Sequence, residues 1–225
     1  KTPNIDRLCE HGVRFARHYS QASPCAPGRA SLYTGMYQMN HRVVANGTPL
    51  DERFDNIALA ARRAGYTPTL FGYTDQSIDP RVTTGADDPR LQTYEGVLPG
   101  FDCALDLTQQ MTPWRELLIE KGYDASPGIL QLLATEHERP VDVSVSNFLA
   151  TNLIDWINSQ ESAWFAHASF IRPHPPYSAA GEYSTMYAPD SVGKPIQRAE
   201  EIHAFHEVML MLDATKAPTD SDEMA

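Results

Sequence analysis

The sequence predicts an α/β protein with a mostly parallel central sheet flanked by helices. A helical pattern is followed by a strand pattern over residues 2–19 and again over 55–73. A third pair follows over residues 144–170. Repeated units of this kind are typical of parallel sheets. With 225 residues, 42% of them hydrophobic, the chain is long enough to bury one real core.

The first helix is expected to begin at Thr2 and Pro3, because threonine favours the N-cap and proline the first helical position. The apolar residues Ile5, Leu8 and Cys9 recur at helical spacing. Gly12 is expected to end the helix. Residues 13–19 are expected to form a short strand or extended segment. The chain starts at Lys1 without methionine and enters a helix at once, so we expect it to be cut at the N-terminus.

Asp55 or Asn56 is expected to cap the next helix, which Gly65 ends. Its apolar face is predicted at Ile57, Ala60, Ala61 and Ala64. Residues 67–73 are rich in β-branched and aromatic side chains and predict a buried strand.

A loop-rich insertion is expected at about 76–140, with one short helix over 113–121. Such an insertion either shapes a substrate pocket or forms a surface excursion without function. Residues 144–159 predict an amphipathic helix, and residues 163–170 a central strand. A last helical stretch is expected over 199–211.

Bulk properties exclude several classes of function. The net charge is −11 and no Lys/Arg cluster stands out, which argues against nucleic-acid binding. No apolar run is long enough to span a membrane. The three cysteines are odd in number and do not suggest a disulfide framework.

Residues 25–35 carry the strongest functional signal. They read Cys-Ala-Pro-Gly-Arg-Ala-Ser-Leu-Tyr-Thr-Gly and fit the pattern C-x-P-x-R-x-x-x-x-T-G. Pro24 and Pro27 predict an extended turn at Cys25, with a helix from Pro27 or Gly28 onward. A nucleophile at a helix N-terminus faces unpaired N–H groups, which suits an anionic substrate. Arg29, one turn on, is placed to reach back to it.

Other interpretations of Cys25 stay open at this point. A lone cysteine is most often a small buried hydrophobic residue. A thiolate phosphatase is a second alternative, but the spacing from Cys25 to Arg29 is too short to wrap a phosphate.

The pattern resembles the signature of type I sulfatases and their relatives in the alkaline phosphatase superfamily. The segments 2–8 and 12–15 are similar to those that precede this signature. The resemblance implies an alkaline-phosphatase-like sandwich, of which the chain covers only a part. It also implies that Cys25 is oxidised to formylglycine, whose hydrated aldehyde attacks sulfur or phosphorus while Arg29 steadies the diol.

Further site residues follow from the resemblance. The run Arg-Pro-His-Pro-Pro-Tyr is similar to the family's histidine loop, which makes His174 the proton donor to the leaving group. Residues 32–49 resemble the phosphonate monoester hydrolase branch, in which the residue at Asn46 contacts the reacting anion. Tyr73 matches that branch, whereas many arylsulfatases have lysine there. Asp75 matches neither pattern, and beside an anionic substrate it needs a partner, which is expected to be Arg81 or a segment outside this chain.

The resemblance also implies a divalent metal ion, with Cys25 (as formylglycine) among its ligands and the other ligands outside this chain. Ca, Mn, Mg and Zn are not distinguished. The expected function is hydrolysis of sulfate esters, phosphonate monoesters or phosphodiesters, small-molecule substrates in each case, and homo-oligomers stay open. The chain alone is expected to be inactive. The alternative is a non-catalytic binding or structural domain that keeps the fold.

Overall fold

The structure is a computed structural model, and it describes residues 2–193 and 201–211. The chain divides into two compact units. The first consists of residues 1–129 and 145–172, and the second of residues 130–144 and 173–225. Each is considered by itself below.

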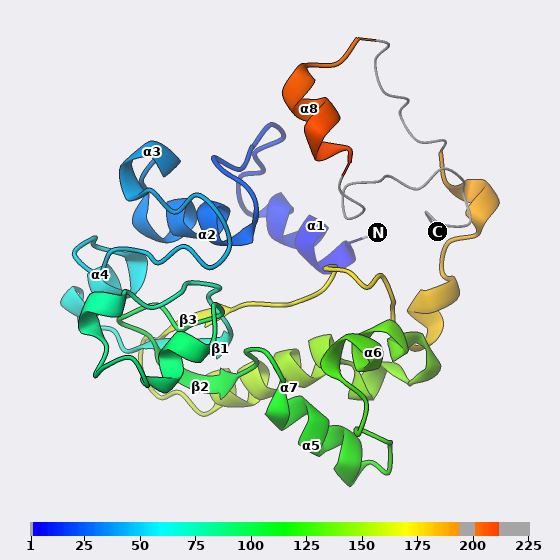
Figure 1. The fold of residues 1–225 in the computed structure, drawn as a ribbon. Coiled ribbons are helices and arrows are strands. Elements are labelled where there is room, and N and C mark those ends of the chain that lie inside the picture. The colour runs from blue at the N-terminus through cyan, green and yellow to red at the C-terminus, as the bar shows by residue number, and fades with distance from the viewer. Residues whose placement is uncertain (1, 194–200, 212–225) are drawn as a thin grey trace. The chain divides into compact units, whose positions relative to one another are not determined.

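The first unit is built on a parallel sheet of three strands in the order β2-β1-β3 (Figure 1). The strands are β1 (Pro68–Gly72), β2 (Asp102–Asp106) and β3 (Phe165–Ala168). Leu70 is opposite Cys103 on one side and His167 on the other. The carboxyl ends of all three strands therefore meet at one edge, where ligand sites of parallel sheets lie.

Helices cover both faces of this sheet, so the predicted α/β class is confirmed (Figure 1). The helices of the unit are α1 (Pro3–Glu10), α2 (Cys25–Thr34), α3 (Gln38–His41), α4 (Ile57–Arg63), α5 (Thr112–Glu120) and α7 (Val145–Asn158). Side chains alternate along a strand. Leu70 therefore packs with Ala30 of α2 and Ala58 of α4, whereas the ring of Phe71 lies 5.6 Å from that of Trp156 on α7.

Several elements lie where the sequence predicted them. Asn56 caps α4, since its Oδ1 accepts hydrogen bonds from the N–H groups of Ala58 and Leu59. All five residues of β1 are buried, as expected of a middle strand. The helices α5 and α7 match the stretches predicted at 113–121 and 144–159 within two residues at each end.

Other expectations were wrong in whole or in part. Of the two alternatives for residues 13–19, the strand does not form, and the segment is irregular and exposed. The α4 residues that are buried are Ala58 and Ala61, while Ile57 and Ala60 are exposed. On the predicted face of α1, Ile5 and Leu8 are exposed and Cys9 is half-buried. The strand β3 lies at an edge of the described sheet, and β2 forms inside the stretch expected to be loops.

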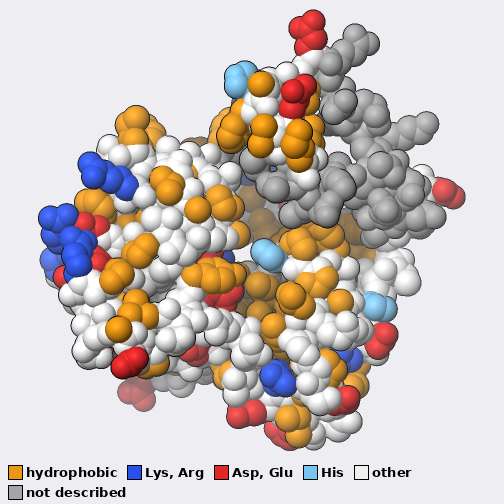
Figure 2. All heavy atoms as spheres, viewed as in Figure 1, with side chains coloured by type: hydrophobic (Ala, Val, Ile, Leu, Met, Phe, Trp, Pro, Cys, Tyr) orange, Lys and Arg blue, Asp and Glu red, His pale blue; other side chains and the backbone are white. Residues whose placement is uncertain are grey.

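The second unit holds α6 (Ile129–Ala134, whose first residue belongs to the first unit) and α8 (Ala204–Met209). A backbone hydrogen bond of 2.9 Å, from the N–H of Gly181 to the oxygen of Arg139, joins the two segments of this unit. Of the helix predicted over 199–211, residues 199–200 lie outside the described residues. Hydrophobic side chains gather over α8, where Phe205 and Val208 are exposed (Figure 2). In the part of the chain that the structure describes, we find no helix with the length and apolarity needed to cross a membrane.

Candidate active site

The helix α2 begins at Cys25 itself, which corrects the prediction of an extended turn before a helix start at Pro27 or Gly28. The first turn of a helix needs no intrahelical acceptor for its N–H groups. Pro27, as the third residue, therefore loses no hydrogen bond, and the helix extends back to Cys25. Gly35 ends it in the left-handed conformation with φ 69°. The thiol of Cys25 is thus at the positive end of the helix dipole.

Asn46 caps this helix from a distant loop. Its Oδ1 accepts a hydrogen bond of 2.9 Å from the N–H of Ala26, the residue after Cys25. Because the oxygen is used in this way, the Nδ2 amino group of Asn46 is the remaining donor. An amide in this orientation can donate to an oxyanion without adding charge.

Arg29 projects from the next turn of α2 into a polar cluster. Its Nη1 donates to Ser169 Oγ at 2.9 Å and to Tyr33 OH at 3.2 Å. Its guanidinium carbon lies 4.7 Å from the centre of the Tyr73 ring, within range of a cation–π interaction. Burial alone would lower the pKa of Arg29, but its neighbours, with Tyr33 the strongest, raise that pKa above the ordinary value. Arg29 is therefore a fixed positive charge.

Tyr73 and Asp75 follow the carboxyl end of β1, and both are buried. Burial raises the pKa of the Tyr73 hydroxyl, so it stays a donor at neutral pH. Asp75 has φ 56°, a left-handed conformation that costs energy in a non-glycine residue and is frequent at functional sites. Its carboxylate is one of the groups that raise the pKa of Arg29, whereas Arg81, the cation expected beside Asp75, binds Asp51 and Asp79.

Ser169 and Tyr33 were missed by the sequence analysis. Tyr33 OH lies 3.2 Å from Nε2 of His167, a histidine that burial keeps neutral by lowering its pKa. The Tyr33 hydroxyl thus accepts a hydrogen bond from Arg29 and makes a second hydrogen bond with His167. Ser169 directly follows β3, and the strand-end rule could have identified it. Tyr33 lies one turn after Arg29 on the same helix, which is also a readable signal.

Tyr94 is a further residue beside the site for which the sequence gave no signal. It is half-exposed, and its Cβ would lie 3.8 Å from a side chain at Gly47. Its backbone oxygen accepts a hydrogen bond from Ser77 at 3.1 Å. Burial, Glu95, Asp75 and Cys25 all raise the pKa of Tyr94, which places its hydroxyl in the same electrostatic environment as Cys25.

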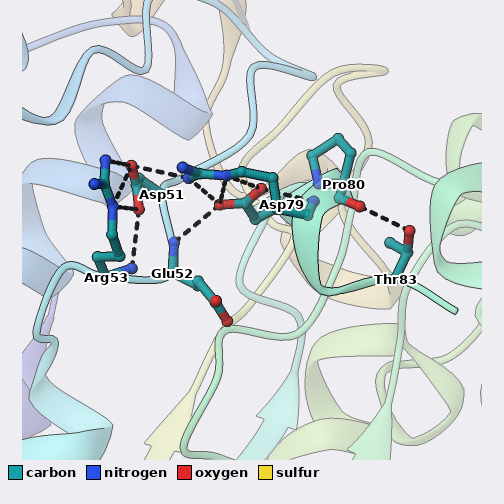
Figure 3. Close-up of polar contacts among 7 residues, drawn as sticks. Asp51, Glu52, Arg53, Asp79, Pro80 and Thr83 are labelled. Atoms are coloured by element: carbon teal, nitrogen blue, oxygen red, sulfur yellow. Dashed lines mark hydrogen bonds and ion pairs between the residues drawn. The ribbon is translucent and has the colours of Figure 1, made fainter.

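An ion-pair network lies next to the loop that carries Asn46 (Figure 3). Arg81 binds both Asp79 and Asp51, the latter at 2.9 Å, and Arg53 binds Asp51 at 2.6 Å. Asp79 is buried and also accepts a hydrogen bond from Glu52 N–H at 3.2 Å. The side-chain hydrogen bonds from Arg81 hold the pKa of Asp79 well below its usual range. The network joins the loop after α3 to the segment after β1.

His41 supports the same loop from inside. Its Nδ1 accepts from Val43 N–H at 3.1 Å, so the proton is on Nε2, which lies 2.9 Å from Ser31 Oγ on α2. Burial lowers the pKa of His41, in agreement with a neutral ring. His41 is thus a structural histidine.

His174 belongs to the second unit, in the loop after Arg172. It is exposed, and its Nδ1 lies 2.8 Å from the backbone oxygen of Pro175. Its role as a proton donor stays a prediction. Among residues 2–193 and 201–211, no group of three or more His, Cys, Asp or Glu side chains comes together as a metal site. The described residues therefore do not fit a metal ion by themselves.

Comparison with known proteins agrees with this arrangement. The family model described as Sulfatase matches residues 1–205. The chain belongs to the sulfatase family. It is 36% identical over 213 residues to the multifunctional alkaline phosphatase superfamily protein PehA of Trinickia caryophylli, with 89% of this chain and 41% of the relative covered. An arylsulfatase of Clostridium perfringens is 23% identical over 210 residues, covering 87% of this chain and 43% of that protein.

Two solved structures of this family share the fold. A phosphonate monoester hydrolase of Agrobacterium radiobacter matches with a TM-score of 0.79 and 46% identity, covering 89% of this chain and 41% of that chain. A phosphonate monoester hydrolase from Silicibacter pomeroyi matches with a TM-score of 0.80 and 38% identity, covering 88% and 42%. The alkaline-phosphatase-like fold is thereby confirmed. The chain spans about two fifths of the length of these family members.

Proposed function

We propose that the whole protein is a hydrolase of phosphonate monoesters, phosphodiesters or sulfate esters, with formylglycine made from Cys25 as its nucleophile. The observation that carries the proposal is the position of Cys25 at the start of α2, with Asn46, Arg29, Tyr73 and Asp75 around it. The hydrated aldehyde supplies an oxygen nucleophile at this position.

In this proposal the chain's own residues orient the nucleophile and stabilise the bound substrate. Arg29 is half-buried, and Ser169 and Tyr33 hold it through Nη1, so its other donors are left to steady the nucleophile's oxygen atoms. Asn46 Nδ2 and the Tyr73 hydroxyl supply neutral donors to the substrate oxygens. His174 protonates the leaving alcohol in this proposal, and its place in the second unit makes that the role most in need of a test.

The charge balance explains why more than this chain is required. The carboxylate of Asp75 lies near enough to raise the pKa of Arg29, so it offsets part of the positive charge that these residues offer an anionic substrate. We propose that a divalent metal ion supplies the further positive charge, bound by the formylglycine and by ligands outside this chain. A Lewis acid beside the reacting group stabilises the charge of the transition state.

Phosphonate and phosphodiester substrates are favoured over sulfate esters. Tyr73 occupies the position at which the resemblance to arylsulfatases expects lysine, and Arg29 covers its ring. The test is to express the full-length protein with formylglycine-forming machinery and compare kcat/KM for p-nitrophenyl phenylphosphonate and p-nitrophenyl sulfate. A large preference for the sulfate ester would contradict this choice.

The alternative, a non-catalytic domain, is tested in the same preparation. The tryptic peptide His18–Arg29 is weighed by mass spectrometry. Conversion of cysteine to formylglycine supports catalysis, and Cys25→Ala should then abolish turnover. Unmodified cysteine together with no tight divalent metal would support the non-catalytic domain.

A further inference from the structure

The side chain of Gln76 joins two backbone segments of the site. It is buried, with 2% of its surface exposed, and it follows Asp75. Its Nε2 donates to Ala26 O at 3.1 Å and to Asp75 O at 2.9 Å. One amino group therefore links the residue after the nucleophile to Asp75, the buried acidic residue that follows β1.

The orientation of this amide is determined by its partners. Both are carbonyl oxygens, which only accept hydrogen bonds, so the nitrogen must face them. Its Oε1 is buried and has no hydrogen-bond partner among the described residues. An unpaired buried acceptor costs about 1–3 kcal/mol, so stability alone does not account for glutamine at this position.

Ala26 is held on both sides. Asn46 Oδ1 binds its N–H at 2.9 Å, and Gln76 Nε2 binds its C=O. The first bond fixes the plane of the peptide between Cys25 and Ala26, and the second fixes the peptide that follows. Ala26 itself has no exposed surface, so its backbone has no room to shift. The direction in which the Cys25 side chain leaves the helix is set by these two peptides.

We propose that Gln76 is a positioning residue, which with Asn46 holds the nucleophile formed from Cys25 in its reactive orientation. The bond to Asp75 O also supports the left-handed conformation at Asp75, so one side chain fixes both the backbone beside the nucleophile and the backbone that carries the buried carboxylate. This inference rests on the proposed role of Cys25. A displacement of about 1 Å at a reacting group can cost about 100-fold in rate.

The test compares Gln76→Met and Gln76→Glu in the full-length protein. Methionine has a similar size and no donor, so kcat is expected to fall about 10- to 100-fold with KM within about threefold of the wild type. In Gln76→Glu the ionised carboxylate faces two carbonyl oxygens, whereas the protonated acid can donate to one of them. Its kcat is therefore expected to recover as the pH falls, which the wild type does not do.

The matched control is Gln38→Met. Gln38 Nε2 also pins a loop by donating to a backbone oxygen, Val43 O at 3.2 Å, but it does not contact Ala26. Each measured kcat is divided by the fraction of the peptide His18–Arg29 that carries formylglycine, so that variants with different degrees of conversion can be compared. A normal kcat in Gln76→Met, or a lowered melting temperature with unchanged kcat, would overturn the proposal.

Hydrogen exchange separates this inference from the proposed function. If the wild type carries formylglycine and turns over no ester, the proposed function fails, and amide exchange in the folded protein still tests the positioning. Gln76→Met should then raise exchange at Ala26 by about tenfold and leave residues 38–45 unchanged. Unchanged protection at Ala26 would refute the role of Gln76.

Discussion

Asn46 combines two functions that two substitutions can separate. Its Oδ1 caps α2 through Ala26 N–H, and its Nδ2 is free to donate to a substrate oxygen. Asn46→Ala removes both. Asn46→Asp keeps an acceptor for the cap, removes the donor and adds a negative charge where an anion must bind.

The two losses have different sizes. A lost N-cap costs about 1 kcal/mol of folding free energy. A lost donor to a developing oxyanion costs about 100- to 1000-fold in rate, about 2.7–4 kcal/mol. Asn46→Ala should therefore be both less stable and about 100-fold slower. Asn46→Asp should melt within about 2 °C of the wild type and be at least as slow as Asn46→Ala.

The assay is kcat/KM for p-nitrophenyl phenylphosphonate, with thermal unfolding followed on the same full-length proteins. Asn56→Asp is the matched control, because Asn56 caps α4 with its Oδ1 in the same way. It should keep the kcat/KM of the wild type. Wild-type activity in Asn46→Asp would refute the donor role, and an unchanged melting temperature in Asn46→Ala would refute the cap.

Three further predictions follow from the same structure. Ser169→Ala removes the acceptor that holds Arg29, so kcat/KM should fall about tenfold with an unchanged melting temperature. Gly72→Ala places a Cβ 2.3 Å from Ser169 O at a residue with φ 108°, and should lower the free energy of unfolding in urea by at least about 3 kcal/mol. The control Gly65→Ala, whose Cβ meets nothing within 4 Å, should lower it by about 1 kcal/mol. The pKa of Asp79 is depressed in the folded state, so its ionised carboxylate stabilises the fold fully above the unfolded pKa of about 3.9. This stabilisation is lost as the pH falls below that value. Asp79→Asn should therefore flatten the dependence of the unfolding free energy on pH below about pH 4.

Hydrophobic patterns and capping residues in the sequence predicted those helices and strands whose formation depends mainly on neighbouring residues. The helices α5 and α7 and the strand β1 have clear patterns, and Asn56 has the side chain of a cap. The strand β2 was missed because four of its five residues are exposed, and only Leu105 shows the buried pattern. The start of α2 was misplaced because the restriction that proline imposes on its predecessor is tolerated in a first helical turn.

The candidate site depends on contacts between residues that are far apart in the sequence. Cys25, Arg29, Asn46 and Tyr73 were found through a resemblance in short motifs, and the structure brings them together. The contacts that hold them were out of reach, because Ser169 is 140 residues from Arg29 and Gln76 is 50 residues from Ala26. Nothing in the local sequence at either position indicates which backbone or side chain it will meet.

The packing of α2 has a consequence for the biosynthesis of the proposed nucleophile. Ala26, Pro27, Ala30 and Tyr33 are buried, so part of the signature is covered once the helix docks on the sheet, while Cys25 and Arg29 are half-buried. If Cys25 is oxidised as proposed, an enzyme that contacts the buried side chains would have to act before that docking. Oxidation would then compete with folding, and substitutions that speed the folding of this unit would lower the fraction of protein that carries formylglycine.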